Sequence, residues 1–470
     1  NEMVDLQSAR FGGLTPISHA FNLADRENLP FVIVSSASSI RLYSTEIGLG
    51  VGRKGRTETF VHCQTNLLGE KEIGNLWLIF AAEALNKKGT FYQLIDDSTR
   101  FSGSLADKLR ERIYIEVVPL LANGIFEELF KGKIKRESLN KIYEMSMLIL
   151  FRILFIAYAE DKDLLPYKSN DLYKKRSLKN IALELKGLID KKEISKLGNS
   201  KVYWDSLKHI FSAINFGNKQ WSVPTYNGGL FLDDNSLLYA DELNELSIKD
   251  KYIGKALSTL LLTEQENTLG PVDFRSLGVR EFGSIYEGLL EGTLNYADAN
   301  LEVLPNGVVK LAKEKSKTNL INKGTLYLSN KSGERKATGT YFTKSFVVDY
   351  LLQNSLNPAL DDHLNQLDKL NDEEAGDKFF DFKVADISMG SGHFLISAID
   401  FMEVKFSNYL SKRKLQRVIS ELSELRNNII FSLGDVSQTT EIEDSQLLRR
   451  LIARRCIYGV DINPVSAQLA

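Results

Sequence analysis

The chain has 470 residues, of which 43% are apolar and 26% charged, and its formal net charge is -2. This length predicts two to four domains, and the composition is ordinary for a soluble globular protein. A net charge this small excludes a global basic field, so any nucleic-acid contact must come from local patches. Cys63 and Cys456 make no disulfide framework and no zinc site, which indicates a reducing, cytoplasmic compartment.

Residues 1–65 are predicted to form a small α/β region. Leu29–Ser35 and Ile40–Ser44 flank a short Ser/Ala turn and predict a hairpin, with a third strand at Thr57–His62. The loop GLGVGRKGR, Gly48–Arg56, matches G-x-G-x-x-G literally, but it joins two strands and opens no helix, so the dipole that holds a phosphate is absent. A flexible hairpin loop is the better interpretation, and contact of its basic residues with DNA phosphate is the alternative.

The run PFVIVSSASSIRLYS, residues 30–44, resembles the late strands of the nuclease-like domain that opens many fused restriction–modification proteins. Cleavage there requires an acid and an Asp/Glu-x-Lys pair that holds a divalent metal. Matches such as Glu184-Leu185-Lys186 lie far downstream and are better explained as chance surface pairs. The resemblance therefore implies a remnant of that domain, with any nuclease centre upstream of Asn1, and no metal site is predicted.

Residues 66–275 are predicted to form a helical connector, because apolar residues recur at helical spacing in runs such as Leu105–Val118 and Leu139–Ala159. The most apolar part, Met145–Ala159, is too short for a membrane span and contains Arg152 in its middle. It therefore predicts a buried helix and no membrane partner.

Three phrases of the helical region resemble the connector of the type IIG restriction–modification and phage-exclusion (BREX-type) methyltransferase families. They are LFRILFIAYAEDKDLLPY (150–167), YNGGLFL (226–232) and VREFGSIYEGLLE (279–291). By pattern alone each is a core element, and Arg152, Glu160 and Asp161 fit structural ion pairs better than chemistry.

Residues 276–335 are predicted to be a linking segment with short strands at Leu301–Leu304 and Gly324–Leu328. The next run, ATGTYFTK at Ala337–Lys344, is a Gly/Thr loop that enters an apolar helix at Ser345–Leu356. A plainly capped helix is one interpretation of this loop.

The same loop resembles the N-terminal cofactor motif of DNA methyltransferases, commonly Gly-x-Tyr-Tyr-Thr-Pro, with Phe342 and Lys344 replacing the second tyrosine and the proline. The resemblance implies that Thr340, Tyr341, Phe342 and Thr343 cover the methionine end of the cofactor.

Residues 336–470 contain the most informative motif, DFKVADISMGSGHFLIS at Asp381–Ser397. Phe382–Ile387 predicts a short buried strand, Ser388–Gly392 a tight turn, and a helix begins at His393. A strand, a glycine turn and a helix place backbone N–H groups and a helix N-terminus against a ligand.

Asp386 ends the predicted strand, where open α/β sheets bind ligands, and Gly390 and Gly392 lack a Cβ, so a ligand can lie on the backbone. The chain has no P-loop run, and Leu395 stands where a dinucleotide loop requires Gly or Ala. An acid at this point favours a cationic ligand over a pyrophosphate. S-adenosylmethionine, with an ammonium and a sulfonium group, fits that description.

The run DISMGSGHF resembles the cofactor motif of amino-type DNA methyltransferases, usually DPAMGSGHF, with Ile387 and Ser388 in place of Pro-Ala. An ordinary strand–turn–helix without a ligand is the alternative. The resemblance implies that S-adenosylmethionine contacts Asp386, Ser388, Met389, Gly390, Ser391, Gly392, His393 and Phe394. His393 is expected to set the turn and is not taken as catalytic.

Residues 394–455 are predicted to be helical with a break at Asn427–Asp435, and Cys456–Val460 predicts a second buried strand. In a doubly wound sheet, the acid after this strand, here Asp461, accepts hydrogen bonds from ribose hydroxyls.

The run YGVDINPVSAQLA resembles the methyltransferase form of this motif, which implies cofactor contacts of Asp461 and Ile462. Asp461 follows Asp386 by far more than the roughly 20 residues of a compact dinucleotide fold. A helical insertion explains the difference.

The predicted fold class is α/β, with the front half of a Rossmann-like S-adenosylmethionine methyltransferase core preceded by the connector and the N-terminal α/β region. Amino methyltransferases hold the target amine with an Asn/Asp/Ser-Pro-Pro-aromatic tetrapeptide, whose ring stacks on the flipped base. The nine prolines of this chain include no adjacent pair, so the tetrapeptide is expected beyond Ala470 and the chain alone is expected to be inactive.

The resemblance implies a site-specific DNA adenine-N6 methyltransferase within a fused restriction–modification enzyme, with double-stranded DNA and other restriction or phage-defence subunits as partners. A non-catalytic DNA-binding or assembly subunit that retains a cofactor pocket is one alternative, and endonuclease activity of the intact polypeptide is another. A nicotinamide oxidoreductase is disfavoured by Leu395 and by the wide Asp386–Asp461 spacing.

Overall fold

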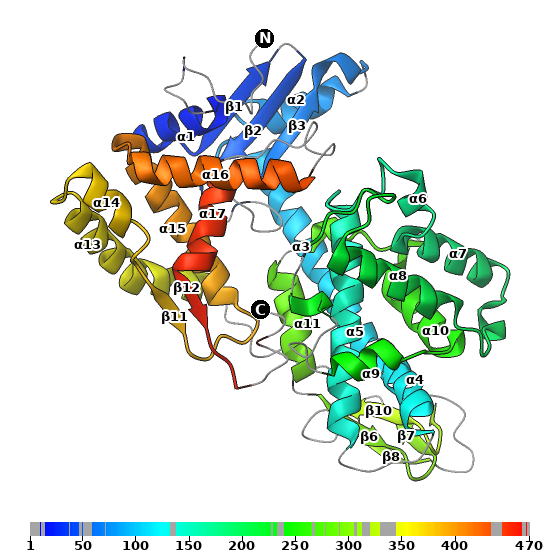
Figure 1. Cartoon of the computed structure of the whole chain (residues 1–470). Helices are drawn as coiled ribbons and strands as arrows, with labels where there is room; N and C mark the ends of the chain where they lie inside the picture. Colours follow the sequence, from blue (N-terminus) through cyan, green and yellow to red (C-terminus); the bar gives the residue numbers. More distant parts are fainter. Residues whose placement is uncertain are drawn as a thin grey trace. The chain divides into compact units, whose positions relative to one another are not determined.

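The computed structural model describes residues 10, 15–36, 38–46, 49, 59–70, 72–131, 138–226, 229–232, 239–265, 268–277, 279–290, 292–304, 308–312, 320–329, 345–433, 444–462 and 467. It is a mixed α/β structure in which helix predominates and the sheets are small (Figure 1). The chain divides into two compact units. The first comprises residues 1–103 and 343–460, and the second comprises residues 104–342 and 461–470. This is a different division from the four sequence segments, whose boundaries stay a prediction.

Three antiparallel strands form the N-terminal sheet in the order β1 (Phe31–Ser36), β2 (Ser39–Ser44), β3 (Phe60–Gln64). This confirms the predicted hairpin and third strand. Helix α1 (Pro16–Arg26) begins at Thr15, whose hydroxyl accepts the Ser18 N–H, and packs Phe21 edge-on against Tyr43 of β2. Helices α2 (Ile73–Phe80) and α3 (Thr90–Arg112) follow. The Gly48–Arg56 loop lies, except for Leu49, outside the described residues.

The second unit is built mainly from helices, which share one large apolar core. They are α4 (Val118–Phe130), α5 (Ser138–Asp161), α6 (Asp171–Lys174), α7 (Leu178–Asp190), α8 (Val202–Phe216), α9 (Ala240–Glu245), α10 (Asp250–Leu261) and α11 (Val279–Leu290), with a π-helical turn at Ile113–Val117 and 3-10 turns at Ile194–Lys196, Gly229–Phe231 and Phe274–Ser276.

Helix α5 runs through the middle of this unit (Figure 1). Among the described residues it is the one helix whose length and composition would suffice to cross a membrane, yet 72% of its most apolar window is buried inside the protein. It begins and ends close to the predicted bounds, and the prediction of a buried core helix is confirmed.

Three small antiparallel sheets complete the second unit. They are the hairpin of β4 (Leu262–Gln265) and β5 (Thr268–Pro271), the pair of β6 (Thr293–Tyr296) and β10 (Leu326–Ser329), and the sheet in which β7 (Leu301–Val303) lies between β8 (Val309–Leu311) and β9 (Leu320–Ile321). The Asn123 side chain of α4 forms two hydrogen bonds with the backbone of β10, in the way that a residue of a neighbouring strand does. Its Nδ2 donates to the Leu326 carbonyl at 2.9 Å, and its Oδ1 accepts the Leu326 N–H at 2.9 Å.

The C-terminal part of the first unit contains two parallel strands and a helical core. Its elements are α12 (Ser345–Leu351), a π-helical turn (Leu352–Leu356), α13 (Asn357–Leu367), α14 (Asp372–Lys378), β11 (Val384–Asp386), α15 (His393–Lys412), α16 (Gln416–Leu433), α17 (Asp444–Arg455) and β12 (Ile457–Gly459). Strand β11 pairs with β12 in parallel, with Asp386 opposite Gly459. The break predicted at Asn427–Asp435 is wrong at its start, because α16 continues to Leu433.

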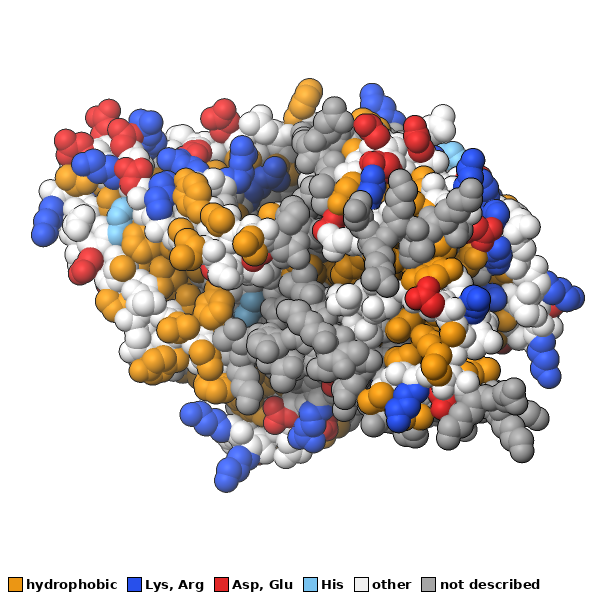
Figure 2. Space-filling view, turned by 90° about the horizontal axis from the view of Figure 1, so that it is seen from below, with side chains coloured by type: hydrophobic (Ala, Val, Ile, Leu, Met, Phe, Trp, Pro, Cys, Tyr) orange, Lys and Arg blue, Asp and Glu red, His pale blue; other side chains and the backbone are white. Residues whose placement is uncertain are grey.

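The two parallel strands are covered on one face. Val384 and Ile457 pack against the core formed by the helices, whereas Ile387, Tyr458 and Val460 are 84%, 52% and 59% exposed. The prediction that both strands are buried is therefore wrong for the residues whose side chains lie on the face away from this core. An apolar run predicts burial throughout, but side chains alternate between the faces of a sheet, and here only one face is covered. Exposed hydrophobic side chains of the chain are visible as orange atoms in Figure 2.

Candidate functional site

The sequence-predicted site begins at the carboxyl end of β11. The carboxylate of Asp386 is partly exposed, and its Oδ1 accepts the Ser388 N–H at 3.0 Å, which closes an Asx turn directly after the strand. Its second oxygen, Oδ2, takes no hydrogen bond from any described residue. One acceptor thus shapes the turn, while the other is open to a ligand.

The glycine turn that follows has the backbone conformation that the motif predicts. Gly390 has φ +52° and Gly392 has φ +74°, in the left-handed region that favours glycine. A Cβ on Gly390 would meet no atom within 4 Å, so there is free space in the Cβ direction of this residue. Gly392 is the N-cap of α15, which begins at His393 as predicted. The result is a left-handed turn of main chain that leads into the N-terminus of a 20-residue helix.

Strand β12 fixes the position of this turn. The Val460 N–H donates to the Asp386 carbonyl at 2.8 Å, and the Met389 N–H donates to the Val460 carbonyl at 3.1 Å. A Cβ on Gly459 would lie 2.0 Å from Met389 Sδ and 2.9 Å from Leu395 Cδ1. Gly459 is therefore a supporting residue that the sequence interpretation missed, although a glycine inside a strand often marks such a close approach. Met389, predicted to bind the cofactor, uses its side chain to pack on β12.

The other predicted site residues divide into three groups. Ser388 is exposed, Ser391 and Phe394 are half-buried, and the buried His393 ring packs near Phe394 at the start of α15. Asp461 and Ile462 follow β12 in the chain but belong to the second unit, where Asp461 is partly buried and Ile462 exposed. The predicted motif at Thr340–Thr343 lies outside the described residues.

A second group of polar residues lies at the C-terminal end of α5, within the helical unit. Glu160 is fully buried and accepts three hydrogen bonds, from the Tyr173 hydroxyl and the Leu178 N–H at 2.8 Å and from the Lys179 N–H at 3.0 Å. The last two donors belong to the first turn of α7, whose N-cap is Ser177. Burial raises the pKa of Glu160 to about 7, although these hydrogen bonds act in the opposite direction.

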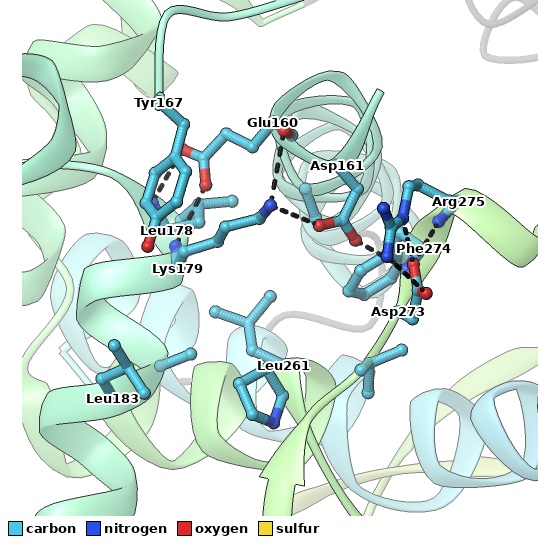
Figure 3. Close-up of a pocket in the computed structure, with 14 residues that line it drawn as sticks. Glu160, Asp161, Tyr167, Leu178, Lys179, Leu183, Leu261, Asp273, Phe274 and Arg275 are labelled. Carbon is cyan, nitrogen blue, oxygen red and sulfur yellow. Dashed lines mark hydrogen bonds and ion pairs between the residues drawn. The ribbon is translucent and has the colours of Figure 1, made fainter. Parts of the chain in front are cut away.

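The neighbouring acid, Asp161, joins two further segments to α5. Its Oδ1 pairs with Lys179 Nζ at 2.7 Å, and its Oδ2 accepts the Phe274 N–H at 2.6 Å. These residues border a cavity of about 380 Å³ in the helical unit. Figure 3 shows Lys179 reaching back to Asp161 on one side of it, with Leu183 and Leu261 on the other. Both oxygens of Asp161 are engaged within the protein, as expected for a structural acid.

Arg152 has a comparable role in the middle of α5. It is buried and donates from Nε to the Leu230 carbonyl at 2.8 Å and from Nη2 to the Leu232 carbonyl at 3.1 Å. Its guanidinium also lies over the rings of Phe211 and Phe231. The predicted ion pair is confirmed for Asp161, which binds Lys179, whereas Arg152 and Glu160 form hydrogen bonds to backbone groups and to the Tyr173 hydroxyl. Two of the three connector phrases meet at this point, since Leu230 and Leu232 belong to YNGGLFL.

A scan of the chain against protein-family models and searches of the curated proteins and of the solved structures each found no match. The function has therefore to be inferred from the motifs of this chain and from the geometry of its own residues.

Proposed function

We propose that the turn between β11 and α15 binds S-adenosylmethionine, and that the chain belongs to a cytoplasmic DNA adenine-N6 methyltransferase. The observation that carries the proposal is the Oδ2 of Asp386, which accepts no hydrogen bond from a described residue, together with the free space in the Cβ direction of Gly390. The resemblance of DISMGSGHF to the cofactor motif of amino-type DNA methyltransferases supplies the identity of the ligand.

The charges of this turn suit the amino-acid end of the cofactor. The carboxylate of Asp386 attracts a cation such as the cofactor's ammonium group. The N-terminus of α15, seven residues further on, carries the partial positive charge of a helix dipole and attracts the cofactor's carboxylate. A pyrophosphate would gain from the helix end but would be repelled by Asp386.

The parallel neighbour strand is compatible with a Rossmann-like methyltransferase core, which is the fold we propose for this part of the chain. The predicted contact of Asp461 with the cofactor's ribose hydroxyls stays an implication of the sequence resemblance, because Asp461 belongs to the second unit. Transfer of a methyl group from sulfonium to an amine requires alignment more than acid–base chemistry. We propose that duplex DNA is the methyl acceptor.

Replacing Asp386 with Asn should weaken S-adenosylmethionine binding by about 10- to 100-fold, because a charge-assisted hydrogen bond contributes roughly 1.5–3 kcal/mol. Asn keeps an oxygen that can accept the Ser388 N–H, so the turn itself should persist. Isothermal titration calorimetry of the whole chain with S-adenosylmethionine measures the change.

The matched control is Asp381→Asn, which removes an exposed acid five residues earlier in the same segment. Its affinity should equal that of the wild-type chain. Equal affinities of the two variants would remove Asp386 from the site, and no binding by the wild-type chain would overturn the proposal.

Replacing Gly390 with Ala tests whether the ligand lies on the bare backbone. The new Cβ meets nothing in the unliganded chain, so the expected loss of stability is the roughly 1 kcal/mol that a left-handed alanine costs. Affinity for S-adenosylmethionine should fall at least tenfold, because the methyl group would occupy the space of the ligand. Gly187→Ala in α7, which also meets no neighbour, should leave affinity unchanged. Normal binding by the Gly390 variant would place the ligand elsewhere.

A further inference from the structure

Positive and negative side chains are segregated around the turn that leads from α5 to α7. The acids near the end of α5 are buried or paired: Glu160 binds the first turn of α7, Asp161 pairs with Lys179, and Asp163 pairs with Lys168 at 2.7 Å. Within residues 160–179, all of which are described, Asp171 is the carboxylate left exposed without an ion pair. The carboxylates of this segment are therefore mostly neutralised or bound by other residues of the same segment.

The same segment also carries three consecutive cations, Lys174, Lys175 and Arg176. We call them the basic turn. All three are exposed, and none has an ion-pair partner among the described residues. The loop that carries exposed Lys219 lies alongside, because Asn170 Nδ2 donates to the Gln220 carbonyl at 3.0 Å.

Two members of the basic turn are held by aromatic rings. Lys174 Nζ lies 5.8 Å from the centre of the Tyr167 ring, and Arg176 Cζ lies 5.2 Å from the centre of the Trp221 ring. A ring restrains a cation but, unlike a carboxylate, does not neutralise it. These charges are thus positioned in advance and remain available to an anion, which distinguishes them from freely moving surface lysines.

We propose that the basic turn contacts the phosphate backbone of nucleic acid. Adjacent cations on one exposed turn suit a polymer with a phosphate at every nucleotide, and arginine matches phosphate with two parallel donors. That the nucleic acid is duplex DNA rests on the proposed function. The basic turn would position the helical unit on DNA without reading its sequence.

The test is the salt dependence of DNA binding by the whole chain, measured by fluorescence anisotropy with a labelled duplex. Each phosphate contact contributes about 0.9 to the slope of log affinity against log salt. The double variant Lys174→Gln/Lys175→Gln should therefore lower that slope by about two and weaken binding at low salt. The loss should be the same for duplexes of different sequence, because phosphate contacts carry no base information.

The control is Lys191→Gln/Lys192→Gln, which removes two exposed adjacent lysines at the other end of α7. The neighbouring carboxylates of Asp190 and Glu193 pair with Lys186 and Lys196. Lys191 and Lys192 therefore differ from the basic turn in where they lie and in having no aromatic ring of the described residues against them. They should contribute little, and the slope should stay at its wild-type value. Both variants change the net charge by the same amount, so a difference between their salt slopes must come from where the two lysine pairs lie.

Equal slopes for the two double variants would overturn the inference. So would displacement of the duplex by poly-glutamate at the same charge concentration, since that result would identify an acidic protein segment as the partner. Titration of the same samples with S-adenosylmethionine keeps the two proposals separate. Cofactor binding without an effect of Lys174 and Lys175 on DNA defeats this inference alone, and absent cofactor binding defeats the proposed function.

Discussion

Replacing Arg152 with Met is expected to lower the free energy of unfolding of the helical unit by about 3 kcal/mol. Met fills a similar volume, so the change removes mainly the donors to the Leu230 and Leu232 carbonyls. Each buried acceptor left without a partner costs roughly 1–3 kcal/mol. Replacing Arg152 also removes the free-energy cost of burying its charge. The expected loss is therefore smaller than the sum of the costs of the two unpaired carbonyl groups.

Tryptophan fluorescence during urea unfolding measures this loss. Trp204 and Trp221 are buried in the helical unit, whereas Trp77 belongs to the first unit and is exposed. The signal therefore reports mainly on the unit that contains Arg152. Arg275→Met is the control, because Arg275 is largely exposed and its ion pair with Asp273 should contribute less than about 1 kcal/mol. Equal midpoints for the two variants would contradict the structural role of Arg152.

Replacing Glu160 with Gln should remove a pH dependence of stability. The folded-state pKa of Glu160, about 7, lies above the ordinary value of 4.5, so the folded chain holds this proton more tightly than the unfolded chain. The resulting stabilisation is complete below pH 4.5 and is lost as the pH rises through 7. A shift of this size corresponds to about 3 kcal/mol.

The measurement compares urea unfolding of the wild-type chain and the Glu160 variant from pH 4.5 to 8. Other groups titrate in both chains, so the difference between the two curves isolates Glu160. Parallel curves would show that the buried acid holds its proton no more tightly than in the unfolded chain.

The local geometry of the proposed cofactor turn could be predicted because it depends on neighbouring residues. An acid, two glycines and an apolar run specify the end of a strand, a left-handed turn and the start of a helix, and the observed Asp386, Gly390 and His393 follow that order. The hairpin of β1 and β2 was predictable for the same reason. Its turn and both strands lie within 14 residues.

Contacts between distant residues could not be predicted in the same way. The partners of Glu160 and Arg152 lie 13 or more residues away and include backbone groups, which every residue carries and which leave no signature in a sequence. The exposure of Tyr458 and Val460 was also missed. Apolar character indicates that a side chain can be buried, but only the neighbouring elements decide whether it is.

The pairing of Asn123 with β10 has a consequence for the order of events during synthesis. The Asn123 amide and its partner, Leu326, are 203 residues apart in the chain. A ribosome that adds about 5–20 residues per second needs roughly 10–40 s to translate that interval. Until β10 emerges, the Asn123 side chain keeps its donation to the Pro119 carbonyl within α4, but its Oδ1 waits for the Leu326 N–H.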